Sequence, residues 1–257
     1  VELMNVSANY MREHVIPDVR LHYTTICDCV PNVVPDECTV WYYIRAPKRE
    51  DVDYVYRWLC DCAKGAALMT QTTFDIEFLT GCSNVMPNDV LEKVMLSAYK
   101  DVGAPKFTEE DHAFARQMAR TYPDVLERDR RIMKEEYGVD GDDKFLCDVV
   151  FDKVIENRLV APGSTDVGDV SHVVPTYQIY VAGQGIGCPG HSWQMTAYSG
   201  HHVGFASMLC AAKVLGVSGL RLLEDPELIR MAWENFHENQ QVPYVSPLPL
   251  DLKPDFT

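Results

Sequence analysis

The first 84 residues alternate between helical and strand-like spacing of apolar positions. A helix-like pattern ends before Pro17, and β-branched and aromatic residues over 20–27 and 38–45 predict two strands. The turns at Pro31-Asn32 and Pro35-Asp36 predict that these strands form an antiparallel pair. A helix over 50–69 and a strand over 72–79 follow. This order predicts a ferredoxin-like α/β sandwich that lacks its first strand.

The remaining chain, 85–257, is predicted to form a second α/β domain. An amphipathic helix over 89–102 precedes a charged, mostly helical insertion at about 104–160, interrupted at Pro123 and at 138–143. A polar loop, a strand over 176–182, a glycine-rich loop and a helix over 201–215 come next. Asp225-Pro226 begins a final helix, because proline is favoured in the first helical turn.

Composition limits the classes of partner. The chain has 257 residues and a formal charge of -15, which argues against nucleic acid and anionic membranes, since both require a cationic surface. We find no apolar run of about 18 residues and no signal peptide, so no membrane contact is expected. The nine cysteines are odd in number and form no CxxC pair. Mostly buried or idle thiols in a reducing, cytoplasmic compartment are expected.

The start of the chain has an unusual feature. The first helix begins at Val1 without a capping residue, so we expect this chain to be part of a longer protein. The alternative is a complete protein trimmed of a tag.

The glycine-rich loop 183–193 holds the clearest candidate metal ligand, His191. A neutral imidazole at a fixed position in such a loop suits zinc or manganese. The alternative is a loop histidine bonded to the backbone. The loop opens no helix of a βαβ unit, which makes a dinucleotide site a weak interpretation. One ligand is also too few for a catalytic metal site, which needs three or more.

Two further groups are candidates for substrate binding. Asn32 and Arg45 lie on the strand–loop–strand unit, where an amide and a guanidinium can grip a carboxylate. Their alternative is a turn asparagine and a surface arginine. Ser164, Thr165 and Asp166 lie in a polar loop that can shape a pocket or orient a histidine. Their alternative is ordinary turn chemistry.

Several ordered stretches resemble the p-aminobenzoyl-glutamate hydrolase branch of the aminoacylase and carboxypeptidase G group of dinuclear metal amidohydrolases. The resemblance extends over nearly the whole chain and is carried by residues 1–14, 31–34, 43–47, 65–70, 164–171 and 211–213.

The resemblance implies a fold and a site. Residues 1–84 would form an incomplete lid and dimerisation domain, and 85–257 would form the C-terminal part of a zinc-peptidase-type catalytic domain. His191 would be the last metal ligand of a site holding two ions, either zinc or manganese. Asn32 and Arg45 would reach the substrate carboxylate, and residues 164–166 would line the pocket. The other ligands and the general-base glutamate are expected outside this chain.

The resemblance also implies an activity and partners. The parent protein would hydrolyse small N-acyl or N-aroyl amino acids such as p-aminobenzoyl-glutamate. It would act as a homodimer, or as a heterodimer with a related polypeptide, joined through the lid. Two alternatives stay open: a non-catalytic dimerisation and substrate-binding fragment, and a dipeptidase or carboxypeptidase of the same group.

Overall fold

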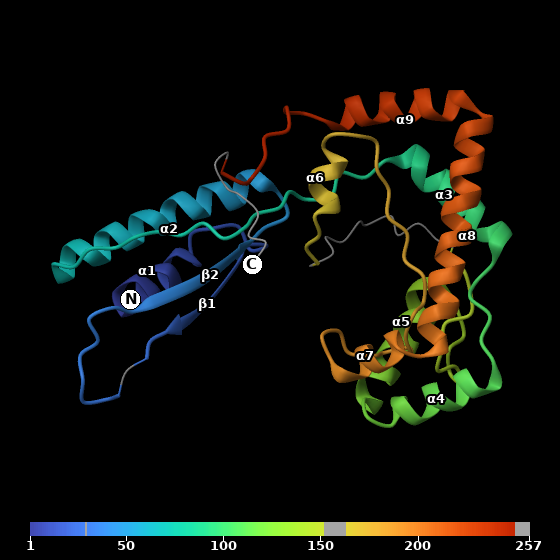
Figure 1. The fold of residues 1–257 in the computed structure, drawn as a ribbon, viewed down its shortest axis with the longest axis horizontal. Helices are drawn as coiled ribbons and strands as arrows, with labels where there is room; N and C mark the ends of the chain where they lie inside the picture. Colours follow the sequence, from blue (N-terminus) through green and yellow to red (C-terminus); the bar gives the residue numbers. More distant parts are fainter. Residues whose placement is uncertain (29, 152–162, 250–257) are drawn as a thin grey trace. The chain divides into compact units, whose positions relative to one another are not determined.

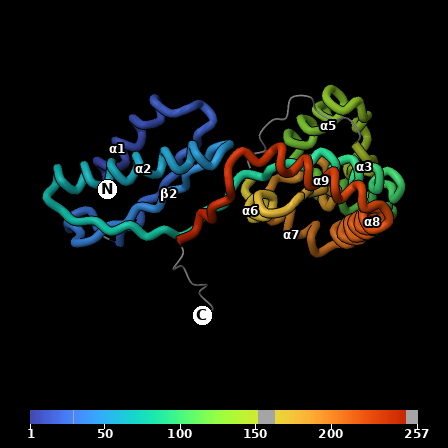
Figure 2. The backbone as a smooth tube through the Cα atoms, turned by 90° about the horizontal axis from the view of Figure 1, so that it is seen from above, coloured from blue at the N-terminus to red at the C-terminus, as the bar shows by residue number. Residues whose placement is uncertain are grey.

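The computed structural model describes residues 1–28, 30–151 and 163–249 (Figure 1). The chain divides into two compact units. The described residues of unit 1 are 1–28, 30–85, 163–170 and 244–249, and those of unit 2 are 86–151 and 171–243. Each unit therefore gathers segments that are distant in sequence, as the mixed colours of unit 2 in Figure 2 show.

Unit 1 contains two helices and a two-stranded antiparallel sheet. Its elements are α1 (Glu2–Met11), β1 (Arg20–Ile26), β2 (Thr39–Arg45) and α2 (Arg49–Thr70). The strand register runs from the Arg20–Arg45 pair to the Ile26–Thr39 pair. Leu21 is buried with apolar residues of both helices, so one face of the sheet supports the core. Trp41 and Tyr43 lie on the other face and are exposed.

The predicted strand over 72–79 is not present, so this prediction is wrong. These residues are irregular, because extended backbone becomes a strand only where a neighbouring strand accepts its hydrogen bonds. Phe78 packs instead edge-on against Tyr56 of α2, with ring centroids 5.9 Å apart. The described part of unit 1 thus has the order helix, strand, strand, helix, with no third strand.

Unit 2 is built from helices and long irregular connections. The helices that follow α2 along the chain are α3 (Asp89–Val102), α4 (Glu109–Ala119), α5 (Pro123–Tyr137), α6 (Val167–Ser171), α7 (Trp193–Ser199), α8 (His202–Glu224) and α9 (Pro226–Asn239). The short helix α6 lies where the chain passes from unit 1 to unit 2. The bounds of α3 agree with the predicted helix, and α9 begins at the predicted proline.

Two apolar clusters hold unit 2 together. The larger joins α4 and α5 to the glycine-rich loop and to Tyr198 of α7, which is fully buried. The smaller joins Ala98 of α3 to Cys210 and Val214 of α8. The Asn88 side chain donates a 2.8 Å hydrogen bond to the Ala232 carbonyl of α9, which ties the first turn of α3 to the last helix.

The sequence prediction differs from unit 2 in three places. Residues 176–182 are irregular rather than a strand, although Ile179 and Val181 do pack on the smaller apolar cluster. Helix α7 was not expected, and α8 continues nine residues beyond the predicted end at 215. Of the predicted insertion, α4 and α5 are helical as expected, and residues 152–162 lie outside the described residues.

Helix α8 is an exception to the expected lack of long apolar segments. Among the described residues, it is long and apolar enough to cross a membrane by length and composition, contrary to the expectation of no such segment. A single helix of this kind is weak evidence for a span, because core helices of soluble proteins have the same composition. Ser207 and Ser218 of α8 are buried polar residues that bond to backbone carbonyls of the same helix.

Candidate functional site

The glycine-rich loop is fixed to the core of unit 2 by close backbone packing. Ile186 donates a 2.9 Å hydrogen bond to the Phe145 carbonyl, and Gly185 forms a β-bridge with Leu146. At Gly187 the backbone is left-handed, with φ of +73°, and a Cβ would stand 2.7 Å from the backbone of Leu126. These contacts require glycine, and they hold the loop rigidly before it reaches His191.

His191 lies on the surface immediately after this anchored turn. Its φ is +53°, an uncommon left-handed conformation for a residue with a side chain. Ser192 caps α7 by accepting a hydrogen bond from the Met195 amide and donates to the Pro189 carbonyl at 2.6 Å. The imidazole is therefore exposed at a position fixed on both sides by hydrogen bonds. Such a sparsely populated backbone conformation persists where the surrounding contacts hold it.

The described residues do not complete a metal site around His191. No group of three or more His, Cys, Asp or Glu side chains within them is placed to hold a metal ion. A divalent ion requires at least three protein ligands in sites of this kind. His191 alone thus fits the role of one ligand and does not form the site.

Two of the predicted substrate-binding residues meet in unit 1. The Arg45 guanidinium, at the end of β2, donates a 2.8 Å hydrogen bond to the Ser164 hydroxyl, 119 residues further along the chain. Arg45 also lies directly opposite Arg20 in the strand register. Like charges opposed across a ladder are unfavourable. Arg20 instead donates to the carbonyl oxygens of Pro17 and Val19.

The loop that carries Ser164 is held in place by Asp169. Its carboxylate accepts hydrogen bonds from the Ser83 hydroxyl at 2.8 Å and from the Tyr244 hydroxyl at 3.1 Å. Burial, together with this carboxylate, raises the pKa of Tyr244. Asp169 therefore acts as a structural anchor for the loop.

The other predicted substrate-binding residues are Thr165, Asp166 and Asn32, which lie in loops of unit 1. The Thr165 hydroxyl accepts a 3.3 Å hydrogen bond from the Val167 amide, and the Asp166 carboxylate accepts one from Thr165 at 3.4 Å. These are local turn contacts, the alternative considered from the sequence. Asn32 lies exposed in a turn of the β1–β2 loop. His191 belongs to unit 2, whereas these residues belong to unit 1.

Unit 2 also contains a polar cluster that was not predicted from the sequence. The Asp111 carboxylate is 1% exposed and lies 2.8 Å from Nδ1 of His202 and 3.6 Å from Nδ1 of His201. A carboxylate only accepts, so His202 Nδ1 carries the proton of the shorter bond. The His201 ring stacks on Phe114 at 3.9 Å. Sequence patterns do not indicate this contact, because the histidines lie about 90 residues after Asp111.

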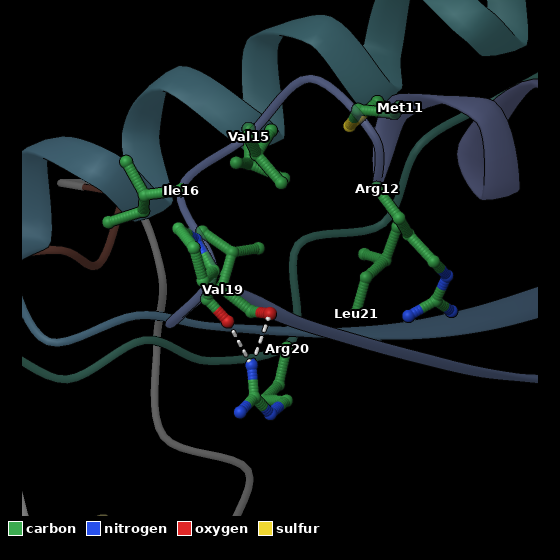
Figure 3. A pocket seen from close by; sticks show the side chains of 9 residues that line it. Met11, Arg12, Val15, Ile16, Val19, Arg20 and Leu21 are labelled. Carbon is green, nitrogen blue, oxygen red and sulfur yellow. Dashed lines mark hydrogen bonds between the residues drawn. The ribbon is translucent and has the colours of Figure 1, made fainter.

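Two small pockets accompany these sites. The first, of about 190 Å³, lies in unit 1 between the end of α1, β1 and α2 (Figure 3). Figure 3 shows the Arg20 guanidinium bonded to the carbonyl oxygens of Pro17 and Val19. Its lining is otherwise mostly apolar, with Met11 and Leu21 at the core side. The second, of about 270 Å³, is lined by apolar residues of α3, α8 and α9 and by Val174 and Pro175. Neither resembles a site with converging catalytic groups.

Comparison with known proteins gives the resemblance a measured extent. No protein-family model matches the chain. It is 25% identical to a mouse Xaa-Arg dipeptidase and 26% identical to a human one, over 91% and 80% of the chain and 44% and 37% of those relatives. Over 99% of its length it is 33% identical to a p-aminobenzoyl-glutamate hydrolase polypeptide of Escherichia coli (strain K12). The chain spans about half the length of that relative, at 55%, and the similarity confirms the resemblance expected from the sequence.

Proposed function

We propose that this chain is part of an amidohydrolase that cleaves small N-acyl or N-aroyl amino acids such as p-aminobenzoyl-glutamate. The observation that carries the proposal is the similarity to the Escherichia coli hydrolase over 99% of the chain. The site supports it, because the Arg45 guanidinium and the Ser164 hydroxyl meet at the end of β2. A guanidinium and a hydroxyl together suit the free carboxylate of such a substrate.

His191 is proposed as one ligand of a divalent metal centre completed by groups beyond the described residues. A bound zinc or manganese ion would activate water and polarise the scissile carbonyl. The anchored loop and the α7 cap would hold the imidazole in one orientation, which lowers the entropic cost of binding. Asn32 and the 164–166 loop are proposed to contact the substrate carboxylate together with Arg45.

Unit 1 is proposed to be a lid and dimerisation domain of the ferredoxin-like type. The protein is proposed to be cytoplasmic. The exposed sheet face bearing Trp41 and Tyr43, whose rings lie 5.4 Å apart, supports a contact role for this unit. The Escherichia coli relative is itself named as one subunit of its hydrolase, which supports an assembly of more than one chain.

The activity is tested with the intact protein and with this chain alone. The intact protein should release p-aminobenzoate from p-aminobenzoyl-glutamate and lose this activity with a chelator. This chain alone should show no turnover, because its described residues supply one ligand. Turnover with stoichiometric metal by this chain alone would exclude the alternative of a non-catalytic fragment.

A dipeptidase activity is the second candidate, because two relatives are Xaa-Arg dipeptidases. Parallel assays with a dipeptide ending in arginine and with p-aminobenzoyl-glutamate separate the two. The proposal requires the larger kcat/KM for the aroyl-glutamate. A preference for the dipeptide would assign the dipeptidase function instead.

Replacing Arg45 by alanine in the intact protein should raise KM for p-aminobenzoyl-glutamate about 10- to 100-fold. The reason is that a hydrogen bond to a charged group contributes about 1.5–3 kcal/mol. An analogue whose carboxylates are converted to amides should lose little. Steady-state kinetics check both, with the exposed Arg57 of α2 replaced by alanine as control. An equal loss for both substrates would contradict the carboxylate role.

A further inference from the structure

Two cysteines lie at the mouth of the loop that joins β1 and β2. The ladder ends with the Ile26–Thr39 pair, and Cys27 and Cys38 are the next residues of the two segments beyond that end. Residues opposed in an antiparallel ladder project their side chains to the same face and have Cα atoms about 4.5–5.5 Å apart. A disulfide requires Cα atoms about 4.4–6.8 Å apart. The backbone register therefore suits a bridge between these two thiols.

The Cys38 side chain lies against the end of the opposite strand. The Cys38 sulfur lies 3.9 Å from the carbonyl oxygen of Ile26, the residue that precedes Cys27 on the opposite strand. Cys27 and Cys38 are both thiols in this structure and both are partly exposed, so a small oxidant can reach them. Cys60 and Cys62 do not suit a bridge to each other, because residues two apart on one helix point in different directions.

We propose that Cys27 and Cys38 form a reversible disulfide that closes the loop of residues 28–37. The oxidant is a small-molecule disulfide such as oxidised glutathione. One protein thiolate attacks it, forms a mixed disulfide and releases one glutathione thiolate. The second protein thiolate attacks the mixed disulfide, forms the protein bridge and releases the other. Two sulfur–sulfur bonds form and two break, and the two protein protons end on the two glutathione thiols.

The bridge has a consequence for the proposed site. The closed loop carries Asn32, which the proposed function assigns to the substrate carboxylate, so this step rests on that function. A loop closed by a disulfide samples fewer conformations. Oxidation should therefore change substrate affinity by restricting where Asn32 can lie. The protein would then respond to the thiol–disulfide balance of its surroundings through one loop.

The bridge is tested by incubating the protein with reduced and oxidised glutathione at graded ratios. Free thiols are then blocked, and the protein is digested without reduction by a protease that cuts at acidic residues. Asp28, Asp36 and Glu37 lie between the two cysteines, so cleavage separates them and mass spectrometry detects a linked peptide. The expected product is an intramolecular Cys27–Cys38 link.

Matched variants make the assignment specific. The link should disappear in Cys38→Ser and persist in Cys29→Ser and in Cys82→Ser, where Cys82 is an exposed thiol elsewhere in unit 1. Glutathione attached to Cys82 without any Cys27–Cys38 link would overturn the inference. A link from Cys27 to Cys29, or between two chains, would overturn it as well.

Binding measurements on the intact protein separate the bridge from the proposed function. Oxidation should change the Kd for p-aminobenzoyl-glutamate at least threefold in the wild type and leave it unchanged in Cys38→Ser. An unchanged Kd with a formed bridge would refute the coupling to Asn32. If neither redox form binds this compound although the linked peptide forms, the proposed function fails and the disulfide stands.

Discussion

Replacing Gly187 by alanine should lower the free energy of unfolding by about 2–4 kcal/mol. Its backbone is left-handed, with φ of +73°, which costs a residue with a Cβ about 1–2 kcal/mol. The added Cβ would also stand 2.7 Å from Cα and N of Leu126 in α5. Because the obstacle is backbone, α5 and the loop must separate. Urea unfolding followed by circular dichroism measures the change.

A matched control lies three residues further along the same loop. A Cβ at Gly190 would meet no atom within 4 Å, and its backbone is not left-handed. Gly190→Ala should therefore change the free energy of unfolding by no more than about 0.5 kcal/mol. Equal urea concentrations at the midpoint of unfolding for the two variants would show that the loop is not anchored through Gly187. In the intact protein, Gly187→Ala should also weaken metal binding if His191 is the ligand proposed above, because it displaces the turn that positions this residue.

Sequence patterns predicted those elements whose causes are local. Helix α3 has the expected bounds because an amphipathic repeat coincides with the Asn88 cap, which accepts a hydrogen bond from the Leu91 amide. Helix α9 starts as expected because Asp225 caps it and Pro226 suits its first turn. The β1–β2 pair follows from two β-prone runs around a proline-containing turn.

The incorrect predictions arise where the decisive contact is distant in sequence. The segments over 72–79 and 176–182 have strand-like composition, but composition does not reveal whether a neighbouring strand exists. The Arg45–Ser164 bond joins residues 119 apart, so no spacing rule predicts it, even though both residues were candidates. His201 and His202 both turn toward the buried carboxylate of Asp111, a contact that their adjacent positions in the sequence do not indicate.

Replacing Asp111 by alanine should lower the free energy of unfolding by about 2–4 kcal/mol. Asp111 closes the capping box of α4, where its carboxylate accepts the Thr108 amide at 2.8 Å and its own amide donates to the Thr108 hydroxyl. The same carboxylate accepts from His202 at the start of α8. Its loss removes the reciprocal half of the capping box at the Thr108 amide and leaves an imidazole without its acceptor. Asp124→Asn, an exposed change in the first turn of α5, should cost much less.

The pH dependence distinguishes the charge of Asp111 from its shape. Burial raises the pKa of this carboxyl, but hydrogen bonds from the Thr108 amide, from His202 and from the Thr108 hydroxyl outweigh burial, and the net pKa is lowered. A carboxyl with a lowered folded pKa contributes stability that is present above its unfolded pKa of about 4 and is lost as the pH falls below it.

The isosteric Asp111→Asn variant should therefore be less stable than the wild type at pH 7, and the difference should shrink as the pH falls from about 5 to 3. Urea unfolding at a series of pH values measures the difference. A gap that stays constant over this range would mean that Asp111 stabilises the junction of α4 and α8 by packing alone. A narrowing gap would show that the carboxylate charge holds the two helix starts together.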